Sequence, residues 1–162
     1  MSFIQEASET IHLPISNVYS DVPIDQVILN HLQKTHEGTC SQYGFVYPDS
    51  IDLVSKSVGS ILTVDGHAKV GYQVSFRFQA LNPCQGDTFP CVVTSQTKMG
   101  LIGYLKHKSV SDPHASPLMF IIPDKTLDPE TVYQSGHTYQ VEILKCRIKY
   151  KSHQIQAAAK IV

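Results

Sequence analysis

Hydrophobic and polar residues alternate strictly in the middle of the chain, where they predict one long strand with a buried face. The apolar residues occupy every second position: Val70, Tyr72, Val74, Phe76 and Phe78. A period of two with aromatic and β-branched residues is typical of a half-buried β-strand. Turn residues precede this strand at positions 65–66, and a Pro/Gly corner follows it at 82–87. We therefore predict two domains, residues 1–82 and 83–162.

The first half predicts a small unit with both strands and a helix. Residues 10–15 alternate as an early strand, and a helix is expected over residues 23–35 with Asp21 as its N-cap. The apolar face of this helix comprises Ile24, Val27, Ile28 and Leu32. A second strand is expected around residues 43–45. Residues 51–61 fit neither period, so we expect a strand with an exposed excursion there.

The second half predicts a five-stranded β-barrel. Its strands are expected at residues 88–97, 101–105, 118–122, 137–150 and 154–162. A polar loop rich in Ser, Pro and His, residues 106–117, separates the second strand from the third. Five short antiparallel strands over about 75 residues match the size of an OB-type barrel. The fold class predicted for the whole chain is therefore α+β.

Composition is that of an ordinary soluble protein. The chain has 162 residues, of which 42% are hydrophobic and 17% charged. Its apolar runs are shorter than the roughly 18 residues of a membrane span, and its first residues do not resemble a secretory signal. Four scattered cysteines without a C-x-x-C pair suit reduced thiols. We expect an intracellular protein without a membrane role.

Charge is distributed unevenly between the two halves. Residues 1–83 carry four basic and eight acidic side chains, whereas residues 84–162 carry nine basic and six acidic ones. The sum over the chain is only −1. This asymmetry indicates that one half faces protein and the other attracts or tolerates a polyanion.

Sequence motifs for catalysis are missing. The chain has no G-x-S-x-G, H-E-x-x-H or Walker pattern, and residues 100–103 lack the third glycine of a dinucleotide-binding loop. A weaker alternative is a metal-dependent enzyme whose metal ligands would be His31, His36 and Cys40. A five-residue step places the two imidazoles on different sides of a helix, and structural zinc normally takes four ligands. We expect no catalytic residues, metal or cofactor.

Basic and aromatic residues gather at two places in the barrel half. The first group surrounds the first hairpin and its loop: Lys98, Tyr104, Lys106, His107 and Lys108. The second alternates along the fourth strand: Lys145, Arg147, Lys149 and Lys151, with Tyr150 nearby. Cations for phosphates and rings for bases are typical of single-stranded nucleic-acid binding. The alternative is a solvated strand face whose lysines prevent edge-to-edge pairing.

An ordered set of short motifs carries a resemblance to a known family. The motifs are Glu37-Gly38-Thr39-Cys40, Tyr43-Gly44-Phe45-Val46, Gly59 and Ile61 with Asp65-Gly66, the strand at 72–78, Pro83 with Gly86, and Gly100-Leu101. Together they resemble the stalk subunit of multisubunit DNA-dependent RNA polymerases. This family contains the seventh subunit of eukaryotic RNA polymerase II and its archaeal counterpart. The resemblance covers residues 10–105 and extends more loosely to the end.

The resemblance implies a non-catalytic subunit in transcription initiation and elongation. Its N-terminal domain would be ribonucleoprotein-like, and its OB-fold domain would contact nascent single-stranded RNA. A small helical partner would complete a stalk heterodimer that docks on the polymerase core subunits through a tip at residues 51–66. The tip residues carried over by position are Ile51, Leu53, Val54, Val58, Gly59, Ile61, Leu62, Asp65 and Gly66. Exposed apolar residues in this stretch would be buried against another chain.

The chain departs from the family pattern in its long loop at residues 106–117 and in ending without the usual tail. Such drift fits a large DNA virus with its own polymerase as well as a cellular organism. The expected location is then the nucleus, or a cytoplasmic replication site or virion. The alternative function is a free-standing OB-fold RNA-binding protein in translation or RNA turnover.

Overall fold

The computed structural model describes residues 2–19, 21–106 and 115–162, and strands dominate it. The chain divides into two compact units, neither of which is a continuous stretch. The sheet unit contains Phe3–Gly38 and Val46–Ala80, and the barrel unit contains Thr39–Phe45 and Leu81–Val162. The amino-acid sequence alone, by contrast, predicts two continuous domains that meet at residues 82–83.

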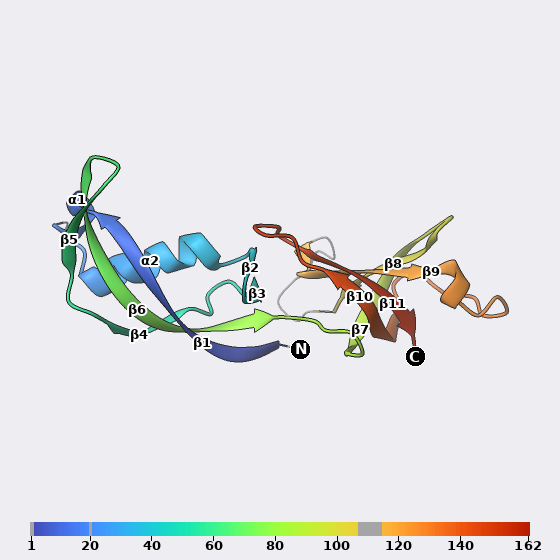
Figure 1. Cartoon of the computed structure of the whole chain (residues 1–162). Helices are drawn as coiled ribbons and strands as arrows, with labels where there is room; N and C mark the ends of the chain where they lie inside the picture. Colours follow the sequence, from blue (N-terminus) through green and yellow to red (C-terminus); the bar gives the residue numbers. More distant parts are fainter. Residues whose placement is uncertain (1, 20, 107–114) are drawn as a thin grey trace. The chain divides into compact units, whose positions relative to one another are not determined.

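The first sheet has six strands, and helix α2 lies along it (Figure 1). In chain order its elements are β1 (Ser2–Pro14), α1 (Ile15–Val18), α2 (Ile24–His36), β2 (Cys40–Ser41), β3 (Gly44–Val46), β4 (Asp52–Lys56), β5 (Ser60–Val64) and β6 (His67–Leu81). The strand order is β1-β6-β3-β2, and β4 and β5 also pair with β6. β6 is therefore the strand around which this sheet forms.

The alternation in β6 produces the predicted buried face. All five apolar residues of the pattern are buried, and Gln73 and Arg77 between them are exposed. Positions 65 and 66 join β5 to β6 with positive φ at both residues, 51° and 78°. Such a turn matches the twist of a hairpin and favours Asp-Gly.

Helix α2 forms where the apolar spacing predicts it, and Ile28 and Leu32 are fully buried. The expected capping by Asp21 is wrong. Pro23 occupies the N-cap position, and among the described residues no side chain makes a capping hydrogen bond there. The helix ends at His36, and Gly38 follows with a φ of +72°. Glycine adopts this conformation without the strain of a Cβ.

The irregular stretch at residues 51–61 contains two strands, β4 and β5, rather than one strand with an excursion. The register against β6 shifts between Leu53 and Ser55, which marks a bulge. Gly59 lies between the two strands. A Cβ there would come within 2.8 Å of Val70 and 2.9 Å of the Tyr72 ring. The break therefore lies against the buried face of β6, at a residue without a side chain.

The barrel unit is a closed five-stranded barrel with OB-like topology. Its strands are β7 (Thr88–Thr97), β8 (Gly100–Leu105), β9 (Leu118–Pro123), β10 (Thr138–Arg147) and β11 (Ile155–Ile161), and η2 (Asp124–Thr126) follows β9. The order around the barrel is β10-β11-β9-β8-β7. The prediction of entirely antiparallel pairing is wrong, because β11 returns between β10 and β9 and pairs with β9 in parallel.

Alternate residues of the five strands fill the barrel. The buried apolar residues are Phe89, Cys91, Val93, Leu101, Leu118, Phe120, Ile122, Val141, Ile143, Ile155, Ala157 and Ala159. Position 103 has to be glycine, because a Cβ at this position would collide with Cys91 Sγ. Residues with small or absent side chains thus make room for the large ones across the barrel.

The segment Thr39–Phe45 belongs to the barrel unit through backbone hydrogen bonds. The Cys40 N–H donates to the Ser152 carbonyl at 2.8 Å, and the Lys151 N–H donates to the Cys40 carbonyl at 2.8 Å. Both partners lie in the turn between β10 and β11. This long-range pairing is the reason that the chain divides discontinuously.

Candidate functional site

The sheet unit exposes apolar side chains at one end, which we name the apolar tip: Tyr19, Val22, Val58 and Ile61. Their exposed fractions are 80%, 45%, 89% and 73%. Helix α1, the start of α2 and strand β5 lie at this end of the unit (Figure 1). Large exposed apolar side chains on neighbouring elements are typical of a docking site.

The predicted tip residues separate into exposed and buried ones. Val54, Val58, Gly59, Ile61, Asp65 and Gly66 are exposed, and Leu53 and Leu62 are half-buried. Ile51 differs, because only 3% of it is exposed. Its backbone N–H lies 3.4 Å from a Glu37 carboxylate oxygen, immediately before β4 begins. Ile51 therefore packs in the core and offers no surface to a partner.

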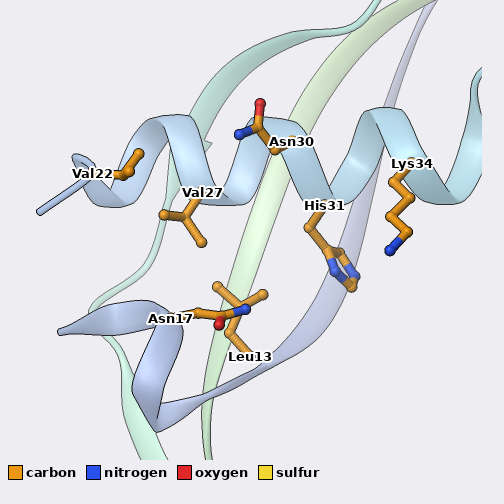
Figure 2. A pocket seen from close by; sticks show the side chains of 7 residues that line it. All are labelled: Leu13, Asn17, Val22, Val27, Asn30, His31 and Lys34. Carbon is orange, nitrogen blue, oxygen red and sulfur yellow. The ribbon is translucent and has the colours of Figure 1, made fainter. Parts of the chain in front are cut away.

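A hollow of about 360 Å³ lies beside the apolar tip (Figure 2). Leu13, Asn17, Val22, Val27, Asn30, His31 and Lys34 line it. Figure 2 shows Val27 and His31 of α2 projecting toward Leu13 of β1 and Asn17 of α1. Burial, reinforced by the nearby His36, lowers the pKa of His31. This hollow is not predictable from the sequence, because the residues of α1 show no helical pattern.

His36 is a core residue of the sheet unit. Its Nε2 lies 3.0 Å from a Glu9 carboxylate oxygen, and its ring stacks on Phe76 with centroids 5.7 Å apart. Within the described part of the chain, no group of three or more His, Cys, Asp or Glu residues is placed to hold a metal ion. The metal alternative based on His31, His36 and Cys40 therefore gains no support.

The outer face of the barrel carries a second hollow, of about 230 Å³, which we name the barrel hollow. Ile121, Lys145, Cys146, Arg147, Gln156, Ala157 and Ala158 line it, from strands β9, β10 and β11. Pairing between these strands aligns two rows of residues. Lys145, Ala158 and Ile121 form one row, and Arg147, Gln156 and Met119 form the other.

The two rows place cations beside apolar surface. Lys145 and Arg147 are exposed, and among the described residues neither has an ion-pair partner. Lys160, on the same pair of strands, differs because its Nζ lies 3.5 Å from a Glu142 oxygen. Ile121 is 37% exposed although it lies on a barrel strand. The barrel hollow thus combines two available cations with an apolar floor.

The other predicted RNA-binding residues lie outside this hollow. Lys98 and Lys106 are exposed near the two ends of β8, whereas Tyr104 is only 8% exposed and offers little ring surface. His107 and Lys108 lie outside the described residues. β10 ends at Arg147, so Lys149 is in the turn after it rather than on the predicted strand.

Tyr150 and Lys151 occupy the same turn as Lys149. The Tyr150 ring is 72% exposed, and Lys151 Nζ lies 5.8 Å from its centroid. Lys151 has a φ of +60°, which turns the chain away from the direction of β10. The alternation predicted through residue 151 therefore fails because the backbone turns, although these side chains remain on the surface.

Among the described residues, no helix is long and apolar enough to span a membrane. Searches with the sequence found no protein-family model that matches it and no curated protein similar to it.

Proposed function

We propose that the chain is a non-catalytic stalk subunit of a multisubunit DNA-dependent RNA polymerase. In this proposal the sheet unit is the ribonucleoprotein-like domain of that family. It docks on the polymerase core through the apolar tip and pairs with a small helical partner, while the barrel unit contacts nascent RNA. The observation that carries the RNA part is the barrel hollow, where two cations without an ion-pair partner among the described residues lie beside apolar surface.

The barrel hollow suits single-stranded RNA on chemical grounds. Phosphate groups need cations that are not already neutralised, and within the described part of the chain Lys145 and Arg147 meet this condition. Unpaired bases need apolar or aromatic surface, which Ile121 and Ala158 supply in the floor and Tyr150 in the neighbouring turn. A duplex would hide the base faces, so the proposal is restricted to single strands.

The apolar tip supports docking on protein. Val58 and Ile61 expose most of their surface, which favours burial against another chain. Both residues lie within positions 51–66, the stretch through which the family resemblance implies docking on the polymerase core. A free-standing RNA-binding protein would have no need for such a surface.

The RNA part is tested by salt titration of affinity for a single-stranded oligoribonucleotide. Each phosphate contact adds about 0.7 to the slope of log affinity against log salt. The variant Lys145→Ala/Arg147→Ala should therefore bind more weakly, with a slope shallower by about 1.4. Lys34→Ala/Lys125→Ala is the matched control, because it removes the same charge from exposed positions outside the barrel hollow. Equal losses in both variants would refute a specific site.

The docking part is tested by isolating the tagged full-length chain from cells that contain its polymerase. Large polymerase subunits and a small helical partner should be recovered in equal amounts with it. Val58→Asp/Ile61→Asp should lose the large subunits and keep its RNA affinity. Recovery of RNA without polymerase subunits would instead favour the free-standing RNA-binding protein.

A further inference from the structure

Two of the four cysteines lie together where the chain enters the barrel. Cys84 is exposed on the corner before β7, and Cys146 is half-buried near the end of β10. The Cys146 thiol donates to the Pro83 carbonyl at 3.2 Å, and the Cys84 thiol donates to the Asn82 carbonyl at 3.8 Å. The two sulfur atoms therefore lie against neighbouring peptide groups, Cys84 against the 82–83 group and Cys146 against the 83–84 group.

Covalent geometry limits the separation of these two residues. A carbonyl oxygen lies about 2.8 Å from the next Cα, so Cys146 Sγ is within about 6 Å of the Cys84 Cα. A disulfide requires Cα atoms about 4.4–6.8 Å apart and a correct choice of side-chain rotamers. Because Cys84 is exposed, its side chain has room to rotate toward Cys146.

The corner that carries Cys84 is fixed in place. The Asp87 carboxylate accepts a hydrogen bond from the Cys84 N–H at 2.9 Å, and the Asp87 N–H donates to the Cys84 carbonyl at 3.1 Å. Gly86 and Asp87 are bonded in turn to Ile143 of β10, at 2.9 and 2.8 Å. The backbone on both sides of the thiol pair is thus held together before any covalent bond forms.

The other two cysteines differ in their surroundings. Cys40 and Cys91 are buried, with exposed fractions of 1% and 0%. Burial raises the pKa of Cys40 to about 11 and that of Cys91 to about 12. Because thiolates are the reactive form, these two thiols are inert at neutral pH and serve as internal controls.

We propose that Cys84 and Cys146 are a redox pair that forms an intramolecular disulfide. With glutathione disulfide as the oxidant, the exposed Cys84 thiolate attacks first and releases one molecule of reduced glutathione. The Cys146 thiolate then attacks the Cys84 sulfur of the mixed disulfide and releases the second. The protein loses two protons and two electrons, and glutathione disulfide takes up both as two thiols.

Partial burial raises the pKa of Cys146, and the nearby Cys84 and Asp87 raise it further. Lys145 and Arg147, the residues before and after Cys146 in the sequence, line the barrel hollow. Cys84 therefore reacts first with the oxidant, and Cys146 acts as the resolving thiol. This proposal does not depend on the function assigned above.

The experiment incubates the full chain with glutathione disulfide, traps free thiols with an alkylating reagent under denaturing conditions, and measures masses. We expect a monomer with two alkylated thiols and one internal disulfide. Cleavage before aspartate residues, at Asp87 among others, places the four cysteines on four different peptides, so the linked peptides identify the pair. Dithiothreitol should restore four alkylated thiols.

Two variants keep the test independent of folding. Cys146→Ser should accumulate the Cys84–glutathione mixed disulfide at least about tenfold above the unsubstituted chain, because the resolving thiol is gone. Cys84→Ser should form no internal disulfide. A mixed disulfide on Cys84 that persists equally with and without Cys146, or a link found only between molecules, would overturn the proposal.

Discussion

Gly100 allows a quantitative test of the barrel, because alanine at this position is opposed by two separate effects. Its φ is +140°, where a side chain is strained, and a Cβ would run into the Ile122 carbonyl oxygen on β9. Gly136 is a matched control with a φ of +87° and nothing within 4 Å of its Cβ position. Any difference between the two alanine variants therefore reports mainly the backbone collision.

The expected costs follow from these two effects. Gly136→Ala should lower the free energy of unfolding by about 1–2 kcal/mol, from backbone strain alone. Gly100→Ala adds the displacement of a packed strand, about 1–3 kcal/mol more. The total for Gly100→Ala is then about 2–5 kcal/mol, with a melting temperature lower than that of Gly136→Ala by roughly 2–4 °C per additional kcal/mol.

The assay uses the buried Cys91 thiol as a probe of barrel opening. This thiol lies on β7 inside the barrel, so alkylation in increasing urea reports unfolding of the barrel unit. The reasoning is refuted if the two variants differ in stability by less than about 0.5 kcal/mol, the usual size of a neutral surface change. It is also refuted if Gly136→Ala is the less stable of the two.

The remaining predictions concern the sheet unit and the corner at Asp87. Ile51→Ala should cost about 2–4 kcal/mol of unfolding free energy because its side chain is buried, whereas the exposed Ile61→Ala should cost less than about 0.5; urea unfolding compares them. The bond from the Cys84 N–H lowers the pKa of Asp87 below its ordinary 3.8, so its stabilisation is present above that pH and lost as the pH falls further. The free energy of unfolding of Asp87→Asn should therefore fall less steeply below about pH 4 than that of the unsubstituted chain. Equal pH dependence of the two proteins in this range would contradict the prediction.

Local patterns predicted the strands well. The alternation around Phe76 predicted β6, and the turn residues at positions 65–66 marked where it begins. These signals act over a few residues, since side-chain alternation and φ are local properties. The helix α2 was predictable for the same reason, although its cap was not.

Pairing between distant segments was not predictable from such patterns. The parallel alignment of β11 with β9 depends on where β11 inserts, which the alternation within β11 does not encode. The hydrogen bonds of Cys40 with residues 151 and 152 likewise join segments far apart in sequence. Ile51 was placed at the docking tip by position, as the family resemblance implies, yet its side chain is buried immediately before β4.

In the candidate RNA site, too, residues marked by a local pattern were predictable and residues joined by long-range strand pairing were not. Lys145 and Arg147 were found from their alternation, but Ile121 and Ala158 were not, because they join these cations only through register across three strands. Tyr104 was chosen for its ring and is nearly buried. Alternation therefore identified the charged residues of the barrel hollow and missed its apolar floor.

The pairing of Cys40 with the turn between β10 and β11 determines how the protein could be dissected. A fragment that begins at residue 83 would leave the Lys151 amide and the Ser152 carbonyl without their backbone partners. Such a fragment would fray at this turn, beside Tyr150. A stable minimal version would require residues 39–45 supplied as a grafted strand, in the manner of a split protein reassembled from two pieces.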